Sequence, residues 1–164
     1  MQRRLIVMRH AKSDWAEPGL SDHRRPLNTR GRTDAPRVGA RLAELGWTPQ
    51  VALCSDATRT RETFELMEPS FPDCELHLLS ELYLPGTGDV LDALATLDDE
   101  VETALVLGHN PGFEQVLGYL SGTFHTMTTA NAALLLASGE SWAEACQAST
   151  MRLQQIVRPK DLDD

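Results

Sequence analysis

The sequence predicts an α/β fold built on one mixed, mostly parallel sheet. Short apolar runs alternate with segments whose apolar residues recur at helical spacing, which is the pattern of strand–helix–strand units. The runs are continuously apolar, as in Leu5–Met8 and Ala104–Leu107, which is typical of parallel strands buried on both faces. Near the end of the chain, Met151, Leu153 and Val157 alternate with polar residues, which favours an antiparallel hairpin with an edge strand.

The remaining elements follow from the same periodicities. We expect strands at 5–8, 51–54, 75–79, 102–107 and 131–137, and helices at 29–45, 55–67, 89–97 and directly after Pro111. Thr29 is the expected N-cap of the first helix and Gly46 its end, and Ser55 is the expected N-cap of the second helix. Pro36 removes an amide donor from the first helix, which predicts either a kink or a start near Asp34.

Length, composition and charge bound the class of protein. At 164 residues with 41% hydrophobic content, the chain is expected to form one domain, residues 1–164, with Lys160–Asp164 frayed. The net charge of −9 argues against nucleic acid and anionic membranes as partners, and we expect a monomer. No apolar run is long enough to span a membrane, and no signal segment precedes the first strand, so we expect a cytoplasmic protein. The three widely spaced cysteines favour reduced thiols.

Cationic and imidazole side chains follow three of the predicted strands. Arg9 and His10 come directly after the first strand, Arg59 lies near the start of the helix after the second, and His109 follows the strand at 102–107. Because the carboxyl ends of parallel strands meet at one edge of a sheet, where ligands bind, we expect these four side chains to converge. The irregular loop at 14–27 has the length of a loop that serves such a site.

These residue types favour a pocket for a phosphoryl group. Arg9 and Arg59 can bind phosphoryl oxygens through forked hydrogen bonds, and His109 can help to neutralise the charge that develops during transfer. His10 is then free to act as a nucleophile, whose ring nitrogen attacks phosphorus before water hydrolyses the phosphoimidazole. Neither histidine has closely spaced ligand partners such as H-E-x-x-H, so we expect no metal and no other cofactor.

Three segments resemble the signatures of the histidine phosphatase (phosphoglycerate mutase-like) superfamily. They are Met8-Arg9-His10-Ala11-Lys12-Ser13, Ser55-x-x-x-Arg59-Thr60-x-x-Thr63 and Gly108-His109-Asn110-Pro111-Gly112. Within it the chain is similar to the small SixA-type phosphohistidine phosphatases, which also match Arg25-Pro26-Leu27-x-x-Arg30-Gly31-Arg32. The resemblance covers most of residues 5–137 and implies a three-layer α/β/α sandwich. It also implies that His10 is phosphorylated, that Arg9 and Arg59 bind the phosphoryl group, and that His109 completes the pocket.

The resemblance also raises the question of a general acid. Many members of the superfamily place an acidic residue in the loop after the third strand, and Glu81 is the carboxylate at that place here. As a single loop glutamate, Glu81 is equally well explained as a solvated surface charge. The SixA-like branch is thought to need little acid catalysis, because a P–N bond breaks readily once the ring nitrogen carries a proton.

Three functions are consistent with these residues. The first is a phosphohistidine phosphatase acting on a phosphorelay or phosphotransfer protein. The second is a phosphomonoesterase acting on a small phosphorylated molecule with the same catalytic residues. The third is a non-catalytic module that binds phosphorylated ligands, which the presence of His10 beside Arg9 disfavours.

Overall fold

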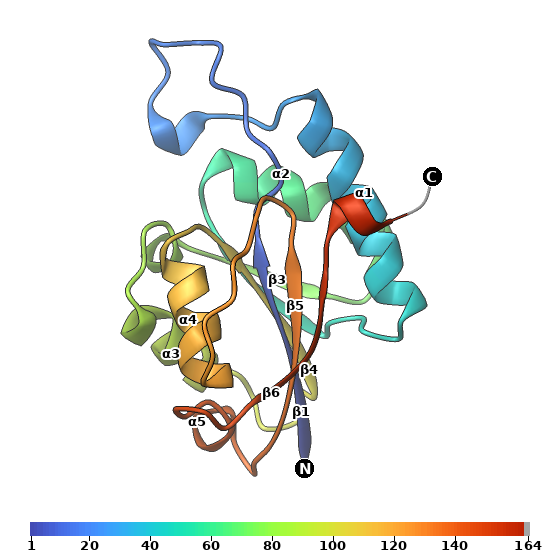
Figure 1. The fold of residues 1–164 in the computed structure, drawn as a ribbon, viewed down its shortest axis with the longest axis vertical. Helices are drawn as coiled ribbons and strands as arrows, with labels where there is room; N and C mark the ends of the chain where they lie inside the picture. Colours follow the sequence, from blue (N-terminus) through green and yellow to red (C-terminus); the bar gives the residue numbers. More distant parts are fainter. Residues whose placement is uncertain (163–164) are drawn as a thin grey trace.

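The computed structural model describes residues 1–162 as a three-layer α/β/α sandwich around a six-stranded sheet (Figure 1). The strands, in the spatial order β3-β2-β4-β1-β5-β6, are β1 (Gln2–Arg9), β2 (Val51–Ser55), β3 (Glu75–Leu79), β4 (Thr103–Gly108), β5 (Ala132–Ser138) and β6 (Arg152–Val157). The helices are α1 (Thr29–Glu44), α2 (Thr58–Met67), α3 (Thr87–Ala95), α4 (Gly112–Ser121) and the short α5 (Trp142–Ala145). Four 3₁₀ turns are η1 (Asp22–Arg24), η2 (Glu68–Ser70), η3 (Ser80–Leu82) and η4 (Pro159–Asp161).

The sheet is mixed, as the sequence predicts. Strand β1 runs parallel to β4, and β2 runs parallel to both β4 and β3. The hairpin of β5 and β6 is antiparallel and joins the sheet through β1. Strands β1, β4 and β2 are therefore parallel neighbours, and their carboxyl ends share one edge of the sheet.

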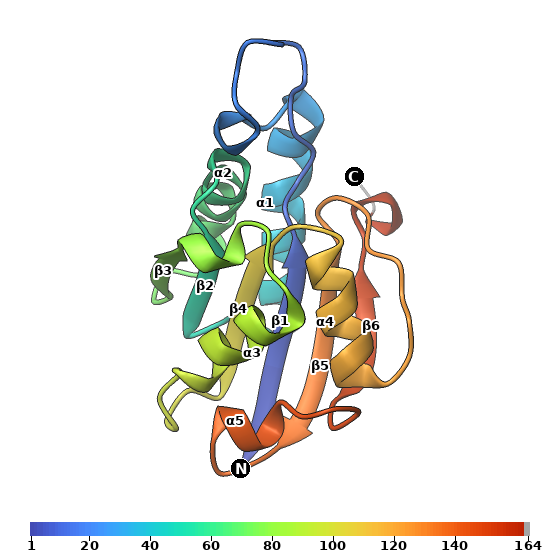
Figure 2. The same cartoon turned by 90° about the vertical axis from the view of Figure 1, so that its left-hand side faces the viewer.

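Each face of the sheet is covered by its own apolar layer. Leu5 and Val7 of β1 pack with α3, α4 and α5, whereas Ile6 and Met8 face α1 and α2. All four side chains are fully buried, which explains why the strand is apolar at every position. Figures 1 and 2 show the two helical layers on opposite sides of the strands, with the loop that precedes α1 extending beyond the sheet.

Two helices start differently from the sequence prediction. The N-cap of α1 is Asn28, whose side chain accepts a hydrogen bond from the amide of Gly31, so the prediction of Thr29 is wrong by one residue. The helix is continuous from Thr29 with Pro36 inside it, so a start near Asp34 is also wrong. Ser55 does not cap α2; it ends β2, and the cap residue is Ala57.

The C-terminal segment that the sequence predicts to be frayed includes a hydrogen-bonded turn that reaches Leu162. Pro159–Asp161 form the turn η4, in which the amide of Leu162 donates to the carbonyl of Pro159 at 3.1 Å. Arg37 of α1 in turn donates to the carbonyl oxygen of Leu162 at 2.7 Å. The last two residues of the predicted frayed segment lie outside the described residues.

At the amino ends of the strands, the fully buried Arg3 ties several loops together. Its guanidinium donates to four backbone carbonyl oxygens, those of Asp99, Val101, Gly139 and Glu140, at 2.6–3.1 Å. These bonds satisfy a buried charge without a carboxylate. Among residues 1–162, no helix is both long and apolar enough to cross a membrane.

Candidate active site

A pocket of about 430 Å³ opens at the carboxyl ends of β1, β4 and β2. It brings together four of the five residues selected from the sequence: Arg9, His10, Arg59 and His109. The rest of its lining is Lys12, Ser13, Trp15, Asp22, Leu84, Asn110 and Thr129. Two other hollows on the surface, of about 470 Å³ and about 290 Å³, contain none of these four residues.

His10 makes a hydrogen bond through each of its two ring nitrogens. Its Nδ1 lies 2.6 Å from the carbonyl oxygen of Ala11, and since a carbonyl can only accept, Nδ1 carries the proton. Nε2 then holds a lone pair and accepts from Nε of Arg59 at 3.3 Å. The backbone amide of His10 donates to Gly108 of the neighbouring strand, which fixes the residue at the end of β1. This tautomer leaves Nε2 unprotonated, with a lone pair that faces Arg59.

The protonation state of His10 supports the same geometry. Burial and, to a smaller extent, the positive charges of Arg59 and Arg9 lower its pKa to about 4, against the hydrogen bond to Ala11 and the charge of Asp22, which raise it. His10 is therefore neutral at pH 7. A neutral imidazole keeps the lone pair that attack on phosphorus requires.

His109 forms the adjacent wall of the pocket. Its ring centroid lies 5.2 Å from that of His10, and its Nε2 lies 2.8 Å from Oγ of Ser55. The hydroxyl of Ser55 accepts from the amide of Ala57, so its own hydrogen can donate to Nε2, an arrangement that fits a proton on Nδ1 of His109. Burial is the main cause that lowers the pKa of His109 to about 3, and the positive charge of Arg59 acts in the same direction.

Two buried donors in the pocket wall have no acceptor. Nδ1 of His109 and Nε of Arg9 make no hydrogen bond to any of residues 1–162. Arg9 uses another nitrogen, Nη1, to donate to the carbonyl of Met127 at 3.1 Å. Because buried polar groups in proteins are nearly always paired, these two nitrogens represent unused hydrogen-bonding capacity beside the pocket.

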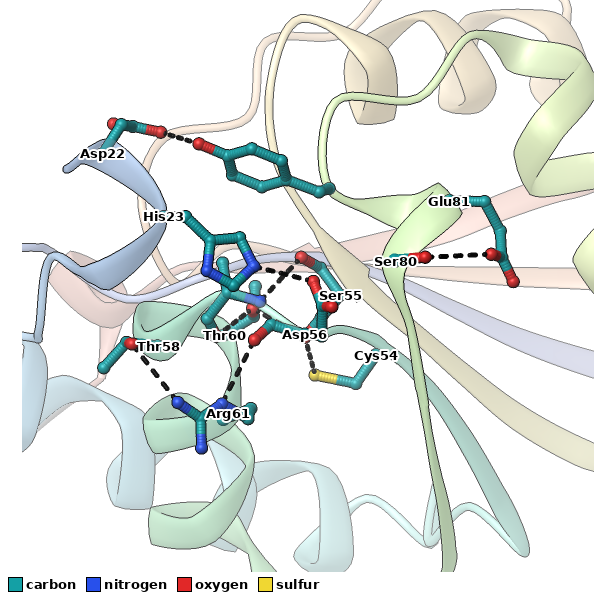
Figure 3. A network of polar contacts seen from close by, with 12 residues as sticks. Asp22, His23, Cys54, Ser55, Asp56, Thr58, Thr60, Arg61, Ser80 and Glu81 are labelled. Atoms are coloured by element: carbon teal, nitrogen blue, oxygen red, sulfur yellow. Dashed lines mark hydrogen bonds and ion pairs between the residues drawn. The ribbon is translucent and has the colours of Figure 1, made fainter.

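The guanidinium of Arg59 is already occupied on its outer side by Asp22. Nη1 donates to the backbone oxygen of Asp22 at 2.7 Å, and Nη2 lies 3.1 Å from its carboxylate. The same carboxylate accepts a hydrogen bond from the hydroxyl of Tyr83 (Figure 3). Partial burial raises the pKa of Asp22, but the hydrogen bonds from Tyr83 and Arg59 outweigh it and hold the pKa below its usual value. Asp22 is thus an ionised carboxylate at the mouth of the pocket.

The turn η1 that carries Asp22 is held at a second point, by Asp56 in the segment that precedes α2. His23 contacts the carboxylate of Asp56 through Nε2 at 2.9 Å, and its ring packs edge-on against Tyr83. Figure 3 shows Asp22 and His23 on the same turn, with the carboxylate of Asp22 directed toward the tyrosine hydroxyl. The loop at 14–27 therefore supplies one wall of the pocket.

The structure does not bring Glu81 into this pocket. Glu81 is exposed in η3, contacts Ser80 Oγ at 3.4 Å, and lines a separate hollow with Asp89 and Asp92 of α3. Figure 3 shows its side chain beside Ser80, apart from Asp22 and His23.

Sequence analysis did not identify Asp22, Ser55 or Tyr83 as part of the site. The irregular loop at 14–27 signalled a functional segment but did not single out Asp22, and Ser55 was explained as a helix cap. Gly108 lies against the ring of Phe113, with which a β-carbon would clash. Among the described residues, no group of three or more His, Cys, Asp or Glu side chains is gathered in a metal-binding arrangement.

Comparisons with known proteins agree with this geometry. Residues 5–83 match the sequence model of the histidine phosphatase superfamily (branch 1). A chloroplastic protein of Arabidopsis thaliana, of uncharacterised function, is 38% identical over 97% of this chain and 79% of its own. A Mycobacterium tuberculosis protein, also uncharacterised, is 36% identical over 71% of this chain and 73% of its own.

Solved structures extend the likeness over the whole fold. A protein assigned as the phosphohistidine phosphatase SixA of Nakamurella multipartitia superposes with a TM-score of 0.84 at 28% identity, over 97% of both chains. A protein histidine phosphatase SixA in complex with tungstate has the same fold, with a TM-score of 0.81 at 23% identity over 98% of this chain and 99% of its own. The chain belongs to the histidine phosphatase superfamily, branch 1.

Proposed function

We propose that this protein is a phosphatase that uses His10 as its nucleophile and removes the phosphoryl group from phosphohistidine in a protein substrate. Nε2 of His10 attacks phosphorus, and the bond from phosphorus to the leaving nitrogen breaks. Water then attacks the phosphohistidine formed on His10, which releases inorganic phosphate and regenerates the neutral ring. One difficult displacement becomes two easier ones.

The pocket offers donors for each stage of this transfer. Arg59 lies 3.3 Å from the attacking nitrogen, so its guanidinium can follow the phosphoryl oxygens as the bond forms. The unpaired Nε of Arg9 and Nδ1 of His109 can each donate to another oxygen. Such preorganised donors stabilise the negative charge of the transition state at little reorganisation cost. To reach Arg59, the phosphoryl group competes with the carboxylate of Asp22.

The observation that carries the choice of substrate is the ionised state of Asp22. Asp22 is the one carboxylate in the lining of the pocket formed by the described residues, and its lowered pKa makes it a poor proton donor. An alkoxide leaving group needs such a donor, whereas an imidazole already protonated on its ring leaves readily without one. An ionised carboxylate also favours a leaving group that carries positive charge.

The test compares phosphohistidine with phosphate monoesters as substrates of the purified protein. We expect phosphohistidine to be hydrolysed about a hundredfold faster than sugar phosphates, since the barrier difference amounts to a few kcal/mol. Equal rates would contradict the proposed substrate and favour a phosphomonoesterase.

A second measurement tests the nucleophile. During turnover of a ³²P-labelled substrate, wild-type protein should carry an acid-labile, base-stable label, which His10→Ala abolishes without loss of fold. The control His77→Ala removes an exposed imidazole from the edge strand β3 and should keep the label. Label on a serine or aspartate would contradict the mechanism, and the absence of both label and turnover would indicate a binding module.

A further inference from the structure

A second hollow, lined by cations, adjoins the catalytic pocket. This groove has a volume of about 180 Å³ and is lined by Lys12, Arg30, Asp34, Thr128, Thr129, Asn131, Pro159 and Lys160. Lys12 and Thr129 line both cavities, so the groove lies next to the catalytic pocket. We call this second hollow the basic groove.

The basic groove is formed by segments that are far apart in the sequence. Lys12 follows β1, Arg30 lies in the first turn of α1, and Lys160 lies in the turn η4 near the C-terminus. Figure 1 shows that turn, in red, beside α1, and the two elements are in contact. The folded chain therefore brings three positive charges to one side of the pocket.

These charges are not balanced within the described part of the protein. The ammonium groups of Lys12 and Lys160 make no hydrogen bond or ion pair with any of residues 1–162. The groove contains one carboxylate, Asp34, which lies 3.4 Å from Arg30 and 3.5 Å from Arg37 and is thus shared with an arginine outside the groove. Such a local excess of positive charge contrasts with the net charge of −9 of the whole chain.

We propose that the basic groove binds a second anionic group of the substrate, a carboxylate or phosphate, while the phosphoryl group to be transferred lies against His10. The three cations Lys12, Arg30 and Lys160 are exposed, so each contributes modestly, and together they give about tenfold in affinity. This inference rests on the proposed phosphatase function and names a feature of its substrate. In a protein substrate, the second anion is an Asp or Glu side chain close to the phosphohistidine.

The test measures binding by calorimetry and needs no turnover. The probes are pairs of phosphonates of equal length, one member ending in a carboxylate and the other in a methyl group, such as 4-phosphonobutyrate and pentylphosphonate. Wild-type protein should bind the carboxylate member about tenfold more tightly. The double variant Arg30→Gln/Lys160→Gln should reduce this ratio to below about threefold, since the loss of two screened ion pairs lowers the preference for the second anion.

A matched control separates the groove from the overall field of the protein. The control variant Arg41→Gln/Arg152→Gln also removes two positive charges, but from positions on α1 and β6 that do not line the groove. It should keep the wild-type ratio of affinities. The inference is overturned by a ratio near one in the wild-type protein, by an unchanged ratio in the groove variant, or by an equal loss in the control. Lys160→Gln alone, at an exposed position, serves if the double variant does not fold.

A kinetic comparison identifies the source of the anion. Phosphohistidine peptides with glutamate neighbours should be hydrolysed faster than matched peptides with glutamine, and the groove variant should remove that preference. If both peptides react alike while the carboxylate phosphonates still bind more tightly, the second anion belongs to a small phosphorylated molecule, which contradicts the protein substrate. Because the calorimetric ratio does not depend on catalysis, failure of the groove can be distinguished from failure of the phosphatase function.

Discussion

The two buried histidines of the pocket should make the protein sensitive to acid. The folded pKa is about 4 for His10 and about 3 for His109, whereas both imidazoles have a pKa of 6.5 when free in an unfolded chain. Because the folded values are lower, the unfolded state binds more protons between these limits. The folded state therefore has its full stability above pH 6.5. It loses stability as the pH falls from 6.5 toward the folded pKa values of about 4 for His10 and about 3 for His109.

The magnitude follows from the same values. At pH 5 the unfolded chain has protonated both imidazoles almost completely, 1.5 pH units below their ordinary pKa, while the folded protein keeps both neutral. Each histidine then lowers the free energy of unfolding by about 2 kcal/mol relative to pH 8, or about 4 kcal/mol together. This is a large part of the stability of a typical domain.

The assay is urea unfolding at pH 8 and pH 5 for wild-type protein and the variants His10→Gln and His109→Gln. Between pH 8 and pH 5 the free energy of unfolding of each variant should fall by about 2 kcal/mol less than that of the wild type. Effects of a substitution that are the same at both pH values cancel in this comparison. The control His77→Gln shows how the loss of an imidazole outside the pocket changes the pH dependence of the free energy of unfolding. Identical losses in wild type, His10→Gln and His109→Gln would refute the reasoning.

Three further predictions concern single residues around the pocket. Arg59→Ala should weaken vanadate inhibition and slow turnover about a thousandfold, and Arg59→Lys should restore only part, because a point charge cannot replace a forked guanidinium; unchanged inhibition would remove Arg59 from phosphoryl binding. Asp22→Asn should lower the Ki of orthophosphate about fivefold, because the carboxylate no longer competes for Arg59, and a higher Ki would contradict that competition. Glu81→Gln should change phosphohistidine hydrolysis by less than about twofold, since Glu81 lies outside the pocket; a selective loss of alkyl phosphate hydrolysis would restore its role as an acid.

The sequence predicted the sheet and the convergence of four side chains for one physical reason. Apolar runs buried on both faces identify parallel strands, and the carboxyl ends of such strands meet at one edge. Arg9, His10 and His109 come directly after these runs, so their convergence needs no knowledge of the loops. Arg59 follows from the same rule because α2 starts close to the end of β2.

The parts that sequence analysis missed depend on strand order and on the path of loops. Strand β3 lies at the edge of the sheet, three positions from β1, or roughly 14 Å at the usual spacing between strands. Glu81 is the second residue after β3 and therefore remains at that edge of the sheet. Tyr83, two residues further on, extends back to contact Asp22. Asp22 itself meets Arg59 across 37 residues through a loop without periodicity, which no local pattern encodes.

The bonds of Arg3 give the opposite end of the sheet a different response to acid. Its four acceptors are backbone carbonyl oxygens, which take up no protons in the range where imidazoles and carboxylates titrate. The hydrogen bonds of Arg3 itself thus include no acceptor that mild acid can neutralise, whereas the pocket end depends on His10, His109 and the pair of Asp22 with Arg59. Acid unfolding should therefore begin at the carboxyl ends of the strands and reach the amino ends last.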